Sequence, residues 1–305
     1  MSAGQDALRK VAAWIDFSAR GRIRATGEDR QRFLHAMTTN HVSGLAPGQG
    51  CYLFFLNAQG RILSDAVLLC ENESFLLCTE AETRAKIVAH LNKFIIADDV
   101  TLEDVSGATA EIAIEGPEAA SMLQRAGAHI PDADYAFVPW HDGILVRWSA
   151  TGQPGFRWIG PPGRRQELAA ALGLIGASTE DARLMRIANG VPRYGEDITE
   201  SNLPQETGLA HALHFNKGCY IGQEIVERIR ARGHVNKRLT RFETEVSVPP
   251  PPGAKIQADG KDVGEVTSAV TVQDGLVRGL AYLRVEALEG TSQLTAGGAV
   301  LQILK

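Results

Sequence analysis

The sequence predicts an α+β protein made of ferredoxin-like split βαβ units, followed by a small C-terminal β-barrel. Three observations lead to this fold class. Strand and helix patterns alternate through the first hundred residues, the alternation partly recurs from Ala110, and short strands punctuated by glycine follow residue 238. A chain of 305 residues is long enough for more than one hydrophobic core. We expect three domains, which cover residues 1–107, 108–237 and 238–305.

The first unit is expected to run strand, helix, three strands, helix, strand. Phe33, Leu34 and Met37 fall on one face of a helix over 28–39. Apolar residues at helical spacing, among them Ile87 and Leu91, predict a second helix after the third of the central strands. The expected strands lie at 16–26, 50–57, 61–70, 74–80 and 99–105. This order is typical of a split βαβ unit.

The second unit begins with an expected strand over 110–115 and continues with a helix that starts at Pro117. A helix over 180–188 follows the capping residues Ser178 and Thr179. Residues 191–224 are then rich in glycine, proline, asparagine and glutamine and show little periodicity. An irregular segment of this length is usually functional.

The composition excludes several classes of protein. No run approaches the roughly 20 apolar residues needed to span a bilayer, and the N-terminal stretch carries charges, so we expect neither a membrane segment nor a signal peptide. The four cysteines form no CxxC pair, which favours the reducing cytoplasm. The net charge of −5 disfavours broad nucleic-acid binding. We expect a monomer.

A local excess of positive charge lies between Lys217 and Arg241, where seven basic residues stand against two acidic ones. This stretch is either a solvated face or a site for an anionic ligand or acidic partner. It overlaps the segment "FNKGCYIGQE" (215–224), which holds an isolated cysteine, Cys219.

The spacing of apolar residues predicts a short helix that starts near Gly222, so Cys219 is expected just before a helix N-terminus. That position and nearby Lys217 favour the thiolate, which could attack an electrophile or bind a soft metal. Gly218 and Gly222 would let the backbone approach a ligand, and Gln223 with the next residue offers planar edges suited to a heterocycle. The alternative is a structural turn with Cys219 as a small buried hydrophobe.

The motif "KGCYIGQE" (217–224) resembles the signature of the folate-binding YgfZ family, a branch of the glycine-cleavage T-protein superfamily. The similarity extends over "LPQETGLAHALHFNKGCYIGQEIVERIRARGHVNKRL" (203–239). It also covers "RIRATGEDRQRFLHAMTTNHV", "FLNAQGRILSDAVLL" and "GVPRYGEDI" upstream. Within the branch, the chain is most similar to the mitochondrial-type iron–sulfur cluster assembly factors.

This resemblance implies domains arranged around a central channel that binds tetrahydrofolate, and a role in the maturation or repair of iron–sulfur enzymes, including enzymes that modify tRNA. Cys219 would be the functional thiol, and a ligand of a 2Fe–2S cluster shared with an iron–sulfur carrier or scaffold protein. Glu206 would read the pterin, while Arg228 and Arg238 would hold the folate glutamate carboxylates. The motif residues expected at the cofactor are Lys217, Gly218, Tyr220, Gly222, Gln223 and Glu224.

Two departures from the aminomethyltransferases bear on the chemistry. Those enzymes carry two adjacent aspartates where this chain has Ser64 and Asp65, and "GKE" where it has "GQE". The loss of one aspartate and the gain of Cys219 argue against glycine cleavage. Asp65 would either hold a folate nitrogen, as a catalytic candidate, or cap the hairpin. A folate-dependent one-carbon (aminomethyl or methyl) transferase and a tRNA-modification factor remain as alternative functions, although direct tRNA binding is disfavoured by the charge.

Overall fold

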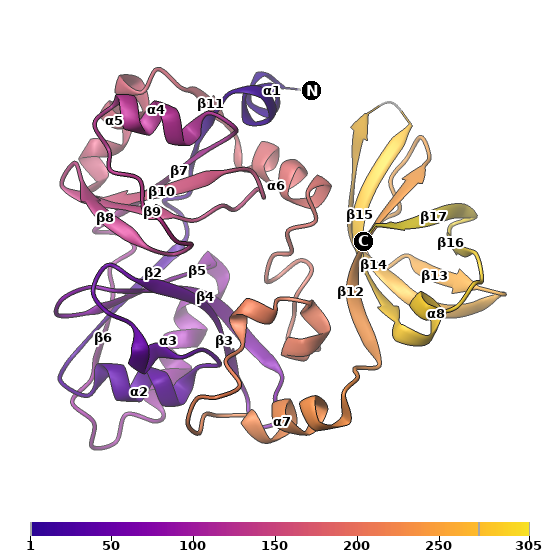
Figure 1. Ribbon diagram of the computed structural model, residues 1–305, viewed down its shortest axis with the longest axis horizontal. Helices are drawn as coiled ribbons and strands as arrows, with labels where there is room; N and C mark the ends of the chain where they lie inside the picture. The colour runs from indigo at the N-terminus through magenta and orange to yellow at the C-terminus, as the bar shows by residue number, and fades with distance from the viewer. Residues whose placement is uncertain (1, 274, 305) are drawn as a thin grey trace.

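The computed structural model describes residues 2–273 and 275–304. Two sheets lie one above the other, and a β-barrel stands beside them, connected by the long segment that includes α7 (Figure 1). The α+β class, the ferredoxin-like sheets and the closed C-terminal barrel are therefore confirmed.

The first sheet has five strands in the order β3-β4-β5-β2-β6. Its strands are β2 (Gly21–Thr26), β3 (Gly50–Leu56), β4 (Ile62–Cys70), β5 (Phe75–Thr79) and β6 (Thr101–Asp104). One face is covered by α2 (Arg30–Met37) and α3 (Arg84–Asn92), whose apolar residues join a buried cluster with those of the strands. The opposite face carries Val67 and Leu69, which pack against Val146 and Ile159 of the second sheet. The two sheets are thus held together by apolar contacts.

The second sheet has six strands in the order β11-β1-β7-β10-β9-β8. Its strands are β1 (Ala13–Asp16), β7 (Ala110–Glu115), β8 (Phe137–Trp140), β9 (Gly143–Arg147), β10 (Gly155–Gly160) and β11 (Ile175–Ala177). The helices that accompany it are α1 (Ala3–Lys10), α4 (Ala119–Arg125), α5 (Arg165–Ala171) and α6 (Thr179–Ala188). Ser178 caps α6, as expected from the sequence, by accepting a hydrogen bond from the amide of Asp181.

The start of the chain differs from the expected domain division. The stretch expected as one strand over 16–26 is broken at 17–20, and β1 pairs with β7 and β11 in the second sheet. Ala13 and Ile15 are fully buried there, beside Leu8 of α1. Residues 3–16 therefore belong with the second unit rather than with 1–107. Local alternation shows that one face of a strand is buried but does not show which sheet buries it.

The barrel closes in the order β12-β15-β14-β13-β16-β17. Its elements are β12 (Lys237–Glu245), β13 (Lys255–Ala258), β14 (Lys261–Gln273), β15 (Leu276–Arg284), α8 (Val285–Glu289), β16 (Leu294–Ala296) and β17 (Ala299–Leu304). Phe242, Val266 and Leu283 lie in its apolar interior. Closure pairs every strand on both sides and leaves no open edge.

The segment between α6 and the barrel folds back on the first sheet. It contains short turns and α7 (Gln223–Arg232), the helix that the sequence predicts near Gly222. Its buried side chains form one cluster with the β3–β4 hairpin: Phe54, Leu56, Ile62, Tyr194, Ile198, Ala212 and Val226. The motif segment thus packs on the first unit, although it follows the second in the chain. Over the described residues, no helix is both long and apolar enough to cross a membrane.

Candidate functional site

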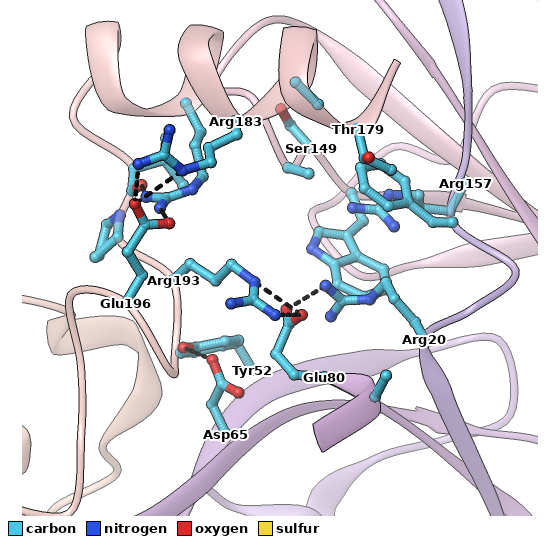
Figure 2. Close-up of a pocket in the computed structure, with 18 of the residues that line it drawn as sticks. Arg20, Tyr52, Asp65, Glu80, Ser149, Arg157, Thr179, Arg183, Arg193 and Glu196 are labelled. Atoms are coloured by element: carbon cyan, nitrogen blue, oxygen red, sulfur yellow. Dashed lines mark hydrogen bonds and ion pairs between the residues drawn. The ribbon is translucent and has the colours of Figure 1, made fainter. Parts of the chain in front are cut away.

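A cavity of about 590 Å³ lies between the two sheets and the segment that follows α6 (Figure 2). The first sheet provides Tyr52 and Asp65, and the second provides Arg157. The segment after α6 contributes Arg193 and Glu196. Further lining residues are Asp16, Phe17, Arg20, Glu80, Glu82, Tyr135, Trp148, Ser149, Thr179, Glu180, Arg183, Arg186, Leu209 and His211. A cavity of this size, lined by aromatic rings and by many charged side chains, can hold a small polar molecule.

Asp65 is the most perturbed carboxyl group of this cavity. It lies in the middle of β4, is only 8% exposed, and accepts a hydrogen bond of 2.7 Å from the Tyr52 hydroxyl. Burial, reinforced by the nearby charge of Glu80, raises the pKa of Asp65 from 3.8 to about 6. Asp65 can therefore take up or release a proton close to neutral pH.

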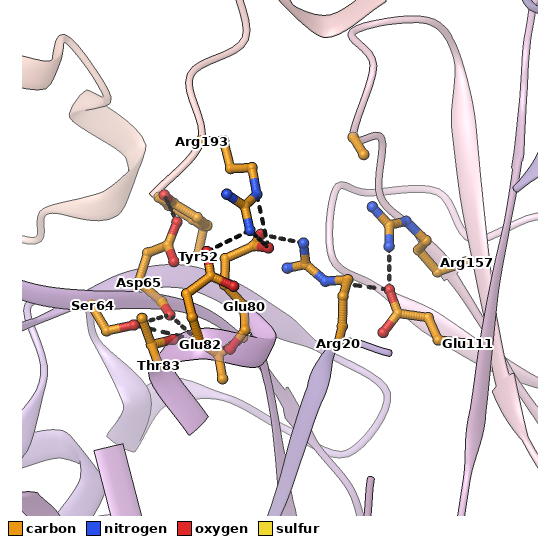
Figure 3. A network of polar contacts seen from close by, with 12 residues as sticks. Arg20, Tyr52, Ser64, Asp65, Glu80, Glu82, Thr83, Glu111, Arg157 and Arg193 are labelled. Atoms are coloured by element: carbon orange, nitrogen blue, oxygen red, sulfur yellow. Dashed lines mark hydrogen bonds and ion pairs between the residues drawn. The ribbon is translucent and has the colours of Figure 1, made fainter. Parts of the chain in front are cut away.

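A chain of ion pairs crosses the floor of the cavity (Figure 3). Glu80 accepts hydrogen bonds from Arg20 and, at 3.0 Å, from Arg193. Burial alone would raise the pKa of Glu80, but these two guanidinium groups together hold it below its usual value. Glu111, fully buried behind the floor, pairs with Arg157. Each of these charged groups has an opposite charge beside it, although Nε and Nη2 of Arg157 have no hydrogen-bond partner among the described residues.

A second group of ion pairs joins α6 to the segment that follows it. Glu196 is held by Arg183, at 2.6 Å, and by Arg186. Arg186 also donates to Asp197 at 2.6 Å. The other oxygen of Asp197 accepts hydrogen bonds from Ser268 and its neighbour in the barrel. This network fixes the barrel against the cavity wall.

Aromatic rings cover the end of the cavity near Asp65. Tyr52, Tyr135 and His211 lie with ring centroids 5.4 to 6.5 Å apart. Tyr135 has a φ angle of +62°, a left-handed conformation that is rare for a bulky residue. Such backbone strain occurs preferentially at functional sites. The arrangement offers a flat aromatic surface beside a carboxyl group that titrates near pH 6, which suits a planar, nitrogen-containing ring.

Among the predicted site residues, Asp65 alone belongs to the lining of this cavity. Its position in mid-strand removes the alternative that it caps the hairpin. The other predicted residues lie outside the lining: Glu206, Lys217, Gly218, Cys219, Tyr220, Gly222, Gln223, Glu224, Arg228 and Arg238. The motif segment is therefore not part of the cavity wall.

Cys219 is exposed, whereas Cys70 and Cys78 are buried and Cys51 is half-buried. This contradicts the alternative that Cys219 is a buried structural residue. The thiol is reachable from solvent but does not line the cavity. It is available to another molecule approaching from outside.

Lys217 does not have the role that we expected. Its ammonium group donates to the backbone carbonyls of His35 and Thr38 at the end of α2, and lies 4.7 Å from the centre of the Tyr220 ring. These carbonyls have no helical partner, so a cation there caps the helix. Burial lowers the pKa of Lys217 to about 7. Lys217 and Tyr220 thus fasten the motif segment to α2, and the expected activation of Cys219 by Lys217 has no support in these contacts.

Gly222 approaches protein backbone rather than a ligand. It has a φ angle of +82°, and a Cβ atom placed on it would lie 2.6 Å from the carbonyl oxygen of Asn57 in the β3–β4 turn. Gln223 accepts a hydrogen bond from the amide of Tyr220, and Glu224 is exposed. These motif residues position the segment on the hairpin.

Gly222→Ala is expected to lower the free energy of unfolding by about 3 kcal/mol, since it combines a left-handed backbone with a steric clash. Gly233→Ala is the matched control, because Gly233 has a φ angle of +77° and open space around it. We expect a loss of about 1 kcal/mol for the control in urea unfolding. Equal losses for the two variants would contradict the close approach at Gly222.

The remaining predicted residues also have structural or surface positions. Glu206 is buried and accepts a hydrogen bond of 3.0 Å from the amide of Leu203, closing its own turn. Its nearest cation is Lys237 of β12, at 3.8 Å. Arg228 and Arg238 are exposed, on α7 and β12. Within 2–273 and 275–304, no group of three or more histidine, cysteine, aspartate or glutamate side chains is arranged to hold a metal ion.

Sequence reasoning missed most of the cavity wall. Tyr52 and Glu80 lie on or beside predicted strands, and their type alone does not distinguish them from ordinary strand residues. Arg20 and Arg157 lie in no motif that would single them out. Glu196 could have been found, because it lies in "GVPRYGEDI", a stretch that resembles the superfamily.

Comparison with known proteins identifies the family. Residues 1–217 match the GCVT N-terminal domain family, and residues 236–305 match the CAF17 C-terminal β-barrel domain. An aminomethyltransferase of Rubrobacter xylanophilus is 31% identical over 302 residues, which cover 95% of this chain and 81% of the relative. A chloroplastic protein of Arabidopsis thaliana, whose transferase designation is provisional, is 29% identical over 96% of this chain and 70% of the relative.

The crystal structure of the glycine cleavage system aminomethyltransferase T from Bartonella henselae has the same fold. It superposes with a TM-score of 0.86 at 23% identity and covers 99% of this chain and 87% of that chain. The chain therefore belongs to the GCVT family, and its C-terminal barrel is of the CAF17 type.

Proposed function

We propose that the central cavity binds tetrahydrofolate and that the protein is a cytoplasmic accessory factor for the maturation or repair of iron–sulfur enzymes, as in the YgfZ branch of the superfamily. Cys219 acts in this role as a thiolate ligand or redox thiol. The folate part of the proposal rests on the cavity, and the accessory part rests on the exposed thiol and the barrel.

The observation that carries folate binding is the pairing of Asp65 and Tyr52 beside stacked aromatic rings in a cavity of about 590 Å³. A pterin has a flat ring and an aminopyrimidine edge with N–H donors. A carboxylate can accept such donors, and aromatic side chains can contact the ring face. Asp65 thus replaces Glu206 as the carboxylate that we assign to the pterin.

The accessory role is favoured by the cavity's incomplete resemblance to a transferase site. Where aminomethyltransferases carry a second aspartate, the Ser64 hydroxyl is fully buried and lies 3.3 Å from the Thr79 hydroxyl. Ser64 has a hydroxyl in place of the carboxylate, and it is absent from the cavity lining. This strand position therefore brings no second carboxylate to the cavity. The match of residues 236–305 to the CAF17 barrel adds support for the YgfZ-like branch.

The iron–sulfur cluster in this role is cargo that the protein shares with a partner. Cys219 is the exposed member of the four cysteines, so its sulfur is the one that a carrier or scaffold protein can reach without unfolding the chain. The other ligands of a 2Fe–2S cluster would come from that partner, since such clusters are usually held by four thiolates.

Calorimetric titration with tetrahydrofolate tests the proposal directly. We expect binding by the wild-type protein and by Cys219→Ala with similar affinity, because the thiol does not line the cavity. Glu206→Gln is expected to bind as well as wild type for the same reason. The absence of heat with the wild-type protein, confirmed by equilibrium dialysis, would refute folate binding.

A one-carbon transferase is the second candidate, favoured by the 31% identity to an aminomethyltransferase and by the position of Asp65 in the cavity. It predicts a folate product when the protein is incubated with tetrahydrofolate and an aminomethyl or methyl donor. Product formation that is lost in Asp65→Asn would favour this candidate, while folate binding without product would favour the accessory role.

A further inference from the structure

A second cavity, of about 510 Å³, lies between the barrel and the segment that follows α6. Its barrel side is formed by strands β12 to β15, and its other side by residues 196–202. Glu196 lines both this cavity and the central one. The second cavity is thus separate from the proposed folate site but shares a wall with it.

Three hydrogen-bond donors on the barrel face this cavity without strong partners. Tyr282 is 8% exposed, and its hydroxyl has no hydrogen-bond partner among the described residues. Arg284 makes no side-chain hydrogen bond or ion pair within the described part of the chain. Lys237 lies 3.8 Å from Glu206, too far for a hydrogen bond, with its ammonium group 4.8 Å from the centre of the Tyr282 ring.

The strand register places these donors together. Lys237 of β12 is directly opposite Arg284 of β15, and Tyr282 is two residues before Arg284 on the same face. Leu283, between them, points into the barrel core. Two like charges directly opposite each other destabilise a sheet when no counter-ion lies between them. Glu206, at 3.8 Å, offsets the charge of Lys237 only, so the stability of the barrel does not explain the second cation, Arg284.

The acidic residues around the cavity are already occupied. Asp197 pairs with Arg186 and accepts from barrel hydroxyls, and Glu265 pairs with Lys255. Asp262 accepts a hydrogen bond of 3.0 Å from Gln257. Lys237 has only the 3.8 Å ion pair with Glu206, while the Arg284 guanidinium and the Tyr282 hydroxyl have no partner among the described residues, so the three groups together provide donors and positive charge.

We propose that Lys237, Tyr282 and Arg284 form a binding site for a carboxylate or phosphoryl group. The group belongs either to the anionic tail of a polyglutamylated folate that reaches past Glu196, or to a free small anion. The first source rests on the proposed function, and the second is independent of it. An anion here would satisfy the Tyr282 hydroxyl and relieve the repulsion between the two cations.

Calorimetry at low ionic strength distinguishes the two sources, with three probes: tetrahydrofolate monoglutamate, its pentaglutamate and inorganic pyrophosphate. A folate tail predicts that the pentaglutamate binds at least tenfold more tightly than the monoglutamate. A free anion predicts pyrophosphate binding with no advantage for the pentaglutamate. In either case, Arg284→Met and Lys237→Met should each weaken anion binding about tenfold, and Tyr282→Phe should weaken it severalfold.

Lys255→Met is the control, because Lys255 lines the same cavity but is paired with Glu265. Arg284 is exposed, so its replacement is not expected to disturb folding even if that of Lys237 does. The proposal is overturned if the affinities for the pentaglutamate and for pyrophosphate are unchanged in Arg284→Met, Lys237→Met and Tyr282→Phe. It is also overturned if Lys255→Met has the same effect as Arg284→Met. Failure of all folates to bind would refute the proposed function, while the pyrophosphate titration would still decide this site.

Discussion

Asp65→Asn is expected to stabilise the folded protein at pH 8 while it weakens folate binding. The folded-state pKa of Asp65 is raised from 3.8 to about 6, mainly by burial. The neutral carboxyl group is favoured in the folded state, so its contribution to the free energy of unfolding is fully present below about pH 4. That contribution is lost as the pH rises through 6, where the buried group must ionise. A neutral asparagine avoids that loss, which amounts to about 3 kcal/mol at most. Urea unfolding of the two proteins at several pH values measures it.

The signature of this prediction is its pH dependence. The advantage of Asp65→Asn should shrink as the pH falls from 8 towards 4, where the wild-type carboxyl group becomes neutral in both states. Asp16→Asn is the control, because Asp16 lines the same cavity at a more exposed position and pairs with Arg165. A stability difference that does not change with pH would contradict the assignment of the burial cost to Asp65.

Folate affinity should change in the opposite direction. If the ionised carboxylate accepts N–H donors of the pterin, its loss costs about 2 kcal/mol, or roughly thirtyfold in the dissociation constant. Wild-type affinity should also fall as the pH drops through 6, whereas that of Asp65→Asn should stay flat. Titrations of both proteins at pH 5.5 and 8 measure this effect. Equal affinities at both pH values for both proteins would remove Asp65 from the binding site.

Cys219→Ala is expected to abolish a cluster shared with a monothiol carrier. Cys219 is the exposed member of the four cysteines. A cluster that loses one of its four thiolate ligands has an iron atom open to solvent and to replacement ligands. The carrier loaded with a 2Fe–2S cluster is mixed with each protein, and the complex is followed by gel filtration and visible circular dichroism. We expect a stable mixed complex with wild type and none with the variant.

Cys51→Ala provides the matched control for that experiment. Cys51 is half-buried, and burial raises the pKa of its thiol to about 12, which makes it a poor ligand near neutral pH. This variant should retain the mixed complex. If Cys219→Ala holds the cluster as well as wild type, the ligand role of Cys219 fails, although folate binding would be unaffected.

The motif segment shows how far local sequence can be interpreted. The helix near Gly222 was predicted because helical spacing is a local property, whereas the sequence left open whether Cys219 is exposed or buried. The partners of Lys217 and Gly222 were not, because they come from α2 and from the β3–β4 turn, both far earlier in the chain. Residues that looked like ligand contacts turned out to dock the segment on the first sheet.

The amino-acid sequence by itself determined the class of fold, most helices and strands, the barrel and the family, since each follows from periodicity, turn residues or a contiguous motif. The tertiary structure alone decided that β1 joins the second sheet and that Asp65, Glu80 and Glu196 share one cavity. The physical reason is that a cavity is made of side chains distant in the chain, and their burial and charge pairing arise only when the sheets stack.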